Sequence, residues 1–302
     1  MTQLFQRTLA KPITATGIGL HSGKKVTLTL MPAEPNTGIV FERTDLGASV
    51  PMDATLVVDT MMSSNLVQGE ARVGTVEHLL SAVAACGLDN LIIQVDAAEI
   101  PIMDGSAAPF LFLIDQAGIC EQTELKKFIK IIKPVEVNDG DKWARLEPYD
   151  DGFLMDFEID FNHAAIAATE QTTQLDFNTA NFAVEVGQAR TFGFLKDLEY
   201  LQKHNLALGG SLDNAVVLDD NSVVNEGGLR YPNEFVRHKM LDAVGDLYVI
   251  GHALLGKFSA YKSGHAVNNA LIRAVLADPS SYEIVTFYDK DACPIAYVEP
   301  SC

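Results

Sequence analysis

The chain repeats one order of secondary structure elements, and this repeat limits its fold more than any other feature of the sequence. In the first half, alternating polar and apolar residues over 25–30 and 38–41 predict half-buried strands. A helix is predicted over residues 75–86, followed by a buried strand over 91–95. A second helix that begins near Ser106 completes the unit.

The second half of the chain follows the same order. Strands are predicted over residues 143–147 and 153–161, and a helix is predicted over 233–250. A strand over 258–262 and a helix over 266–277 come next. The pattern therefore predicts a fold of the α+β class, built from a duplicated unit.

The length of the chain is consistent with a duplication. At 302 residues it can form two ordinary domains, each with a core of its own. We place the boundary near residues 124–127, so that the first domain covers 1–125 and the second covers 126–302. The leading helices also share a local pattern, because residues 76–78 read Val-Glu-His and residues 236–238 read Val-Arg-His.

Charge and hydropathy exclude several classes of function. The formal net charge of −18 would repel a polyanion, and no dense cluster of lysine and arginine offers a face for phosphates, so we expect no nucleic acid partner. The sequence contains no stretch of about 18 apolar residues, and its first 20 residues lack the apolar segment of a signal peptide. We therefore expect no transmembrane segment and a cytoplasmic location.

The cysteines are too scattered to indicate a disulfide framework or a thiolate zinc site. No two of them form a C-x-x-C pair. We expect all four to be reduced: Cys86, Cys120, Cys293 and Cys302.

Histidine and carboxylate side chains on the two leading helices indicate a metal site. His238 and Asp242 are four residues apart and leave one face of the second-half helix, and Asp246 extends that face by a turn. By itself this spacing is a weak signal, because a surface ion-pair helix explains most such matches. His78 favours the metal site, because it lies on the equivalent helix of the first half. Glu77, directly before it, is placed to act as a general base.

Of the other five histidines, one is a candidate functional residue and four show no sequence pattern that indicates a function. His265 follows a glycine at the turn into the last long helix, where a functional role and a simple cap are both compatible with the sequence. The remaining four are interpreted as structural or surface residues: His21, His163, His204 and His252.

A segment over residues 188–225 is longer than a compact connection requires, and we interpret it as an insertion into the second domain. It carries too many leucines for a solvated loop. The leucines could belong to an extra helix packed on the core, or they could form the wall of an apolar ligand pocket. The sequence pattern alone leaves both alternatives open.

Several motifs occur in order along nearly the whole chain. They lie at residues 16–21 (TGIGLH), 75–79 (TVEHL), 99–106 (EIPIMDGS), 189–194 (ARTFGF), 237–242 (RHKMLD) and 261–265 (YKSGH). Together these motifs resemble those of the UDP-3-O-acyl-N-acetylglucosamine deacetylase family. The resemblance implies two similar α+β domains, each a layer of helices on a layer of sheet, with the active site between them. It also implies a zinc-dependent hydrolase of lipid A biosynthesis.

Carried over position by position, the resemblance implies a role for each polar residue of the site. The zinc ligands are His78, His238 and Asp242, and Glu77 is the general base. His265 becomes the cationic partner of the oxyanion and the proton donor to the leaving amine. Asp246 stabilises its protonated form, and the Thr191 hydroxyl donates to the same oxyanion.

The resemblance also implies a substrate, a small-molecule nucleotide sugar with a fatty acyl chain. It makes the insertion the passage for that chain, which favours the pocket alternative. Two other functions stay open: a zinc amidase for another N-acetylated substrate, and a module that binds a nucleotide sugar without catalysis. The expected contacts are Lys239 and Lys262 near the sugar and diphosphate, Asp160 and Phe161 near the uridine, Phe192 and Phe194 at the mouth of the passage, and Leu198 and Leu212 along it.

Overall fold

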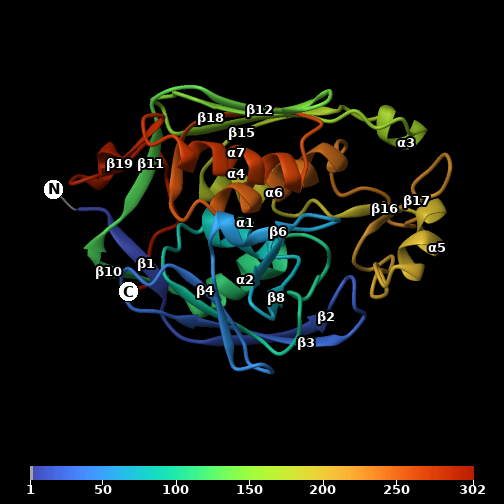
Figure 1. Ribbon diagram of the computed structural model, residues 1–302, viewed down its shortest axis with the longest axis horizontal. Helices are drawn as coiled ribbons and strands as arrows, with labels where there is room; N and C mark the ends of the chain where they lie inside the picture. Colours follow the sequence, from blue (N-terminus) through green and yellow to red (C-terminus); the bar gives the residue numbers. More distant parts are fainter. Residues whose placement is uncertain (1–2) are drawn as a thin grey trace.

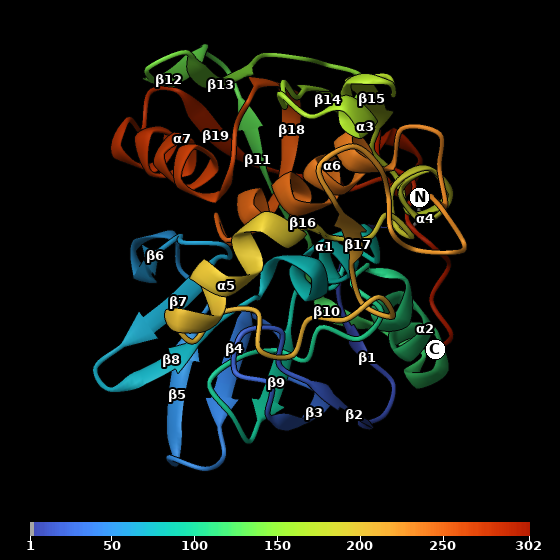
Figure 2. The same cartoon turned by 90° about the vertical axis from the view of Figure 1, so that its right-hand side faces the viewer.

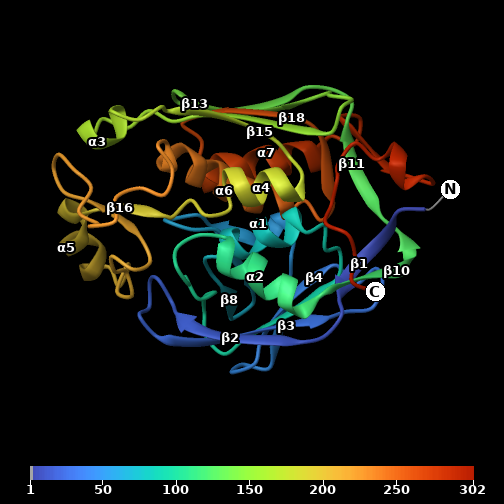
Figure 3. The ribbon, with the colours of Figure 1, turned by 180° about the vertical axis from the view of Figure 1, so that it is seen from behind.

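Four layers make up the molecule, with two β-sheets on the outside and two layers of helices between them. The computed structural model describes residues 3–302. Figure 1 shows one sheet at the top and the other at the bottom, and Figure 3 shows the same layers from behind. Each sheet buries one face against helices, which is the usual solution for an amphipathic sheet. The α+β class predicted from the sequence is confirmed.

The lower sheet belongs to the first half of the chain. Its five strands have the order β2-β3-β9-β4-β5, in which β4 and β9 are parallel and the other neighbours are antiparallel. In β3 every second residue is buried, so its alternating sequence gives one core face. The bounds are β2 Ile13–Ile18, β3 Lys25–Pro32, β4 Ile39–Arg43, β5 Ala48–Pro51 and β9 Leu91–Val95, with helices α1 Glu77–Ala85 and α2 Ala108–Ala117.

The upper sheet repeats this order in the second half. Its strands β12-β13-β18-β14-β15 pair in the same directions, with β14 and β18 parallel. Strand β11 pairs in parallel with β18, and β19 pairs antiparallel with β11. The bounds are β11 Lys127–Ile131, β12 Val135–Asp139, β13 Lys142–Glu147, β14 Phe153–Glu158, β15 Thr172–Asp176, β18 Ala253–Tyr261 and β19 Tyr282–Thr286, with helices α4 Thr179–Glu185, α6 Glu234–Tyr248 and α7 His265–Ala277.

The shared strand order supports the internal duplication, which stays a prediction. The predicted boundary also stays a prediction, and it falls between β10, which ends at Leu125, and β11, which begins at Lys127. Strand β10 pairs with β1 in a separate ribbon. The other elements are β1 Phe5–Leu9, β6 Val57–Asp59, β7 Asn65–Gln68, β8 Ala71–Val73, β10 Ile119–Leu125, α3 Ala164–Ala167 and the short 3-10 turns Ala54–Leu56 and Lys290–Ala292.

The insertion forms a small unit of its own at one end of the layers. Strands β16 (Phe192–Phe194) and β17 (Val216–Leu218) pair in parallel, and α5 (Leu195–Lys203) lies between them in the chain. No residue of α5 is buried. Figure 2 shows this helix in front of the helical layers. The insertion therefore does contain an extra helix, but that helix is not packed into the core.

Two cysteines differ from the sequence-based expectation. Cys120 on β10 and Cys302 form a disulfide, so the expectation that all four thiols are reduced is wrong for this pair. Their partners could not be inferred from spacing, because the pairing depends on the last residues of the chain lying against β10, where the Ser301 N–H donates to the Ile119 carbonyl. Cys86 and Cys293 are free. Across residues 3–302, none of the helices has both the length and the apolar character needed to cross a bilayer.

Candidate metal centre and active site

Helices α1 and α6 cross at close range, and this crossing places the polar residues of the two halves together. All nine residues of α1 are buried, including Glu77 and His78. Gly245 makes the approach possible, because a side chain carbon at this position would overlap the backbone of Glu77. Buried polar groups are costly unless they are paired, so their concentration at this crossing indicates a functional site.

Three ligand atoms converge at the crossing. The Nε2 atoms of His78 and His238 each lie 3.3 Å from Oδ1 of Asp242, and the two imidazole rings meet edge to face at 4.9 Å. This carboxylate oxygen is buried and has no hydrogen-bond partner among the described residues. An unpaired buried oxygen facing two imidazole nitrogens fits a divalent cation.

Neighbouring groups fix the orientation and charge of these side chains. Nδ1 of His238 lies 3.0 Å from the Ala189 carbonyl, so it carries the proton and leaves Nε2 free. Nζ of Lys239 lies 2.7 Å from Oδ2 of Asp242, which leaves Oδ1 free.

Protonation states agree with this assignment. Burial lowers the pKa of His238 to about 4, so the imidazole is neutral. Burial alone would raise the pKa of Asp242, but the polar and charged groups around it, among them the Lys239 ammonium, outweigh burial and hold that pKa well below its usual value. A neutral imidazole and an ionised carboxylate are the forms that bind metals.

Glu77 and His265 lie beside the three candidate ligands. One oxygen of the Glu77 carboxylate accepts the Ser64 N–H at 3.0 Å, and the other lies 3.9 Å from Nε2 of His265. His265 begins α7, and its Nδ1 lies 2.9 Å from Oδ2 of Asp246. The site residues predicted from the two leading helices and from the last turn therefore lie in one buried cluster.

Burial and charge set the protonation of this pair. Burial raises the pKa of Glu77 above its usual value, with His265 acting in the opposite direction. Burial would lower the pKa of His265, but the carboxylates of Asp246 and Glu77 outweigh it and raise the pKa to about 9. At neutral pH the imidazole is therefore a cation that can donate a proton, next to a carboxylate that can accept one.

Thr191 and the aromatic residues lie on the segment that leads into the insertion. The Thr191 N–H donates to the Gly105 carbonyl at 2.8 Å. The Phe192 ring centre lies 6.3 Å from that of His238 and 5.5 Å from that of Phe161. Phe194 joins the same cluster, at 6.5 Å from both phenylalanines. The aromatic residues expected around the substrate thus lie together beside a ligand histidine.

The predicted lysine contacts fall into two groups. Lys239 lies among the metal-site residues, because it pairs with Asp242. Lys262 directly follows β18 and lies in an exposed network, where its Nζ is 2.7 Å from Asp141 and 3.3 Å from Asp160. Of the predicted passage residues, Leu198 is half-buried on α5 and Leu212 is about half exposed.

His21 is a half-buried polar residue that the sequence pattern does not single out, since it predicts only a structural or surface role. Its Nε2 is buried and has no hydrogen-bond partner among the described residues. Burial lowers its pKa, and the charges that act on it include Glu99, Arg72 and His265. The side chain of Glu99 holds the His21 loop by accepting the N–H of His21 and of Ser22. The only sequence signal for His21 is the TGIGLH motif that contains it.

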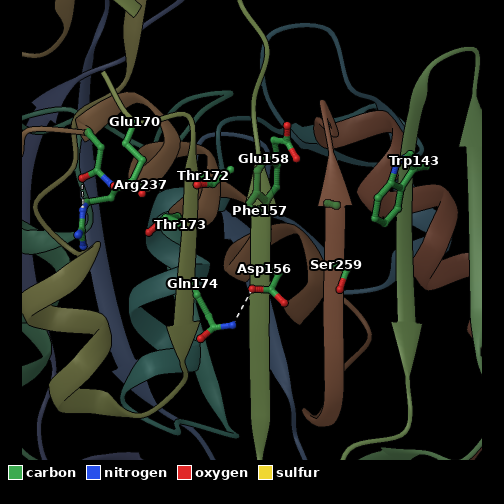
Figure 4. Close-up of a pocket in the computed structure, with 12 residues that line it drawn as sticks. Trp143, Asp156, Phe157, Glu158, Glu170, Thr172, Thr173, Gln174, Arg237 and Ser259 are labelled. Carbon is green, nitrogen blue, oxygen red and sulfur yellow. Dashed lines mark hydrogen bonds between the residues drawn. The ribbon is translucent and has the colours of Figure 1, made fainter. Parts of the chain in front are cut away.

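A shallow hollow of about 570 Å³ lies on the upper sheet, outside the buried cluster at the helix crossing. Figure 4 shows Trp143, Asp156 and Gln174 on its strands. None of the predicted catalytic or metal-binding residues lines it. We assign the functional site by the buried cluster at the helix crossing, because the chemistry of the side chains is there and not in the hollow.

The fold and the cluster together define a class of protein: an α+β protein with a three-ligand candidate metal site flanked by a carboxylate and a cationic imidazole. The family model of UDP-3-O-acyl N-acetylglycosamine deacetylase matches residues 6–277. The chain belongs to this family, which confirms the resemblance found in the sequence.

Curated relatives are similar over almost their whole length. The chain is 60% identical over 294 residues to the UDP-3-O-acyl-N-acetylglucosamine deacetylase of Psychrobacter sp. (strain PRwf-1), covering 97% of this chain and 99% of the relative. It is 58% identical to the enzyme of that name from Vibrio vulnificus (strain YJ016) and 56% identical to that from Shewanella frigidimarina (strain NCIMB 400). Both comparisons cover 98% of each chain.

Proposed function

We propose that the protein hydrolyses the N-acetyl amide of UDP-3-O-acyl-N-acetylglucosamine, which gives UDP-3-O-acyl-glucosamine and acetate in lipid A biosynthesis. One observation carries the proposal: His78, His238 and Asp242 converge beside Glu77 and His265 in a chain of this family. The relatives named above carry the name of this deacetylase. The cytoplasmic location expected from the sequence stays a prediction.

Zinc is the metal we propose for the site. Two histidines and one aspartate leave a fourth position open, which is typical of catalytic zinc, and a cation would pair with the buried Oδ1 of Asp242. When bound there, the ion would supply Lewis acidity, which favours deprotonation of water and polarises the amide carbonyl. His78, His238 and Asp242 would hold it.

The protein's own residues then move the protons. Glu77 accepts a proton from the attacking water as the bond from oxygen to the carbonyl carbon forms. His265, as a cation, stabilises the negative charge on the carbonyl oxygen and donates its proton to the amine as the carbon–nitrogen bond breaks. Asp246 stabilises the cationic imidazole. The Thr191 hydroxyl donates to the oxyanion, a contribution of roughly 3 kcal/mol for such a donor.

These roles predict a bell-shaped dependence of kcat/KM on pH. Activity requires His265 protonated, so it should fall as the pH rises through about 9. It requires Glu77 ionised, so it should also fall as the pH drops through a pKa that burial has raised. His265→Ala should flatten the basic limb, measured as acetate release across the pH range. An unchanged basic limb would assign that ionisation to another group.

Recognition of the substrate is proposed for the residues around this cluster. Lys262 and Asp160 would face the diphosphate and uridine, with Phe161 against the base, and Lys239 would lie near the sugar. Phe192 and Phe194 would form the mouth of the acyl passage, and Leu198 and Leu212 would line it. The exposure of the α5 leucines supports this, because an apolar helix face without a core partner can bind an acyl chain.

A substrate without the 3-O-acyl chain should be hydrolysed poorly. Each buried methylene contributes about 0.8 kcal/mol, so four of them amount to about 3 kcal/mol, or roughly two orders of magnitude in kcat/KM. A bulky side chain at Leu198 or Leu212 should shift the preference to shorter chains. The comparison is kcat/KM for acylated and des-acyl UDP-sugars. Equal values would mean that the insertion binds no acyl chain.

One experiment tests the proposed function against its alternatives. Purified protein is assayed for metal content and for acetate release from UDP-3-O-acyl-N-acetylglucosamine. Zinc with acetate release supports the deacetylase. Acetate release from other N-acetylated sugars only would indicate a different amidase, and binding without release would indicate a nucleotide-sugar-binding module.

A further inference from the structure

Ser64 contacts both the proposed base, Glu77, and Asp246, the carboxylate that binds the proposed acid, His265. It lies in the loop between β6 and β7 and is 2% exposed. Its N–H donates to Oε2 of Glu77 at 3.0 Å, and its hydroxyl donates to Oδ1 of Asp246 at 2.6 Å. One residue of a loop thus binds a carboxylate on α1 and a carboxylate on α6.

The Asp246 carboxylate is fixed at both oxygens. Oδ1 accepts the Ser64 hydroxyl, and Oδ2 accepts Nδ1 of His265 and Nδ2 of Asn268, each at 2.9 Å. Asn268 is itself held by the Ser263 hydroxyl at 2.6 Å. Because donors bind both oxygens, the plane of the carboxylate cannot rotate without breaking a bond. The direction of the His265 ring follows from that plane.

Only one direction of the Ser64 hydroxyl proton is compatible with these contacts. An ionised carboxylate only accepts, so the single hydroxyl proton of Ser64 must point to Asp246. The bond is short, buried and assisted by charge, which makes it stronger than a neutral hydrogen bond. Removing the hydroxyl would leave a buried oxygen of Asp246 without this donor.

We propose that Ser64 is a positioning residue that sets the geometry of both the base and the acid. Its backbone N–H binds one oxygen of Glu77 and so orients the carboxylate, whose other oxygen faces His265. Its hydroxyl fixes Asp246, and through Asp246 it fixes His265. This inference rests on the proposed function, and it adds to that function a role for a loop residue that the sequence analysis did not single out.

The expected effect of Ser64→Ala is a fall in kcat of about 10- to 100-fold, comparable to the loss of other orienting partners. KM should stay within about twofold, because Ser64 contacts none of the residues proposed to bind substrate. The backbone N–H to Glu77 is retained in this variant, so the loss measures the hydroxyl alone. Ser64→Thr, which restores a hydroxyl, should recover most of kcat.

A second measurement separates positioning from a general structural effect. Ser64→Ala is combined with His265→Ala, and kcat is compared in both backgrounds. If the hydroxyl acts through His265, its removal should have little further effect once the imidazole is absent. An equal fold-loss in both backgrounds would overturn the proposal, even if the variant is less stable. A kcat of Ser64→Ala within twofold of the unsubstituted protein would also overturn it.

Ser281→Ala is the matched control. Ser281 is also fully buried, and its hydroxyl donates to the Asp278 carbonyl at 2.7 Å, beyond the far end of α7 from His265. Its replacement removes a buried hydrogen bond but should leave kcat unchanged. Failure of the proposed function is distinguishable, since it would appear as no acetate release by the unsubstituted protein, whereas the Ser64 inference is judged on ratios to that protein.

Discussion

Replacing Glu77 with glutamine is expected to lower kcat by about two orders of magnitude or more while the metal stays bound. Glutamine keeps the shape of the side chain, and its carbonyl oxygen can still accept the Ser64 N–H. It cannot take a proton from water. The measurements are kcat for acetate release and zinc content of the purified variant.

The zinc content of the variant distinguishes a Glu77 that acts as the base from one that binds the metal. Its oxygens contact Ser64 and face His265, and it is not one of the three ligand residues. Loss of zinc together with activity would make Glu77 a ligand and not the base. Glu121→Gln, a half-buried glutamate on β10, controls for the loss of a carboxylate outside the site.

Replacing His238 or Asp242 with alanine is expected to deplete the protein of zinc and abolish most activity. Each side chain provides one of three ligand atoms, so its loss should exceed the ~10- to 100-fold drop in affinity that follows loss of a group that only orients a ligand. Zinc per chain is measured after dialysis against a fixed concentration of free zinc, together with kcat at that concentration.

His252→Ala is the control for these variants. His252 lies just beyond α6, and burial lowers its pKa as it lowers that of His238. It is outside the ligand cluster, so its variant should keep a full complement of zinc. Equal zinc content in all three variants would reject the His–His–Asp site.

The sequence predicts the helices that carry the site residues better than it predicts where those helices cross. Spacing alone places His238 and Asp242 on one face of α6, because helical geometry is local. The approach of His78 depended on the pairing of two helices, and the close crossing depends on Gly245. A glycine within a helix does not show from sequence which backbone it approaches, so this contact could not be predicted.

Contacts made by loops could not be predicted for a similar reason. Ser64 and His21 lie in segments without periodicity, and their partners are distant in the chain. The disulfide of Cys120 with Cys302 likewise depends on how the end of the chain lies against β10. The contacts of these loop and terminal residues need tertiary structure. The pair of Lys239 with Asp242 differs, because it joins residues three apart on α6 and is local.

The crossing of α1 and α6 also ties the occupancy of the site to the integrity of the whole fold. One candidate ligand atom comes from the first half of the chain and two come from the second, so an ion held by all three would require both halves to have docked. Thermodynamic linkage then adds about 1.4 kcal/mol to the free energy of unfolding for each tenfold excess of free metal over its Kd. An ion bound there would act as a reversible cross-link between the two halves, and a chelator would loosen the same contact that aligns the proposed base with the proposed acid.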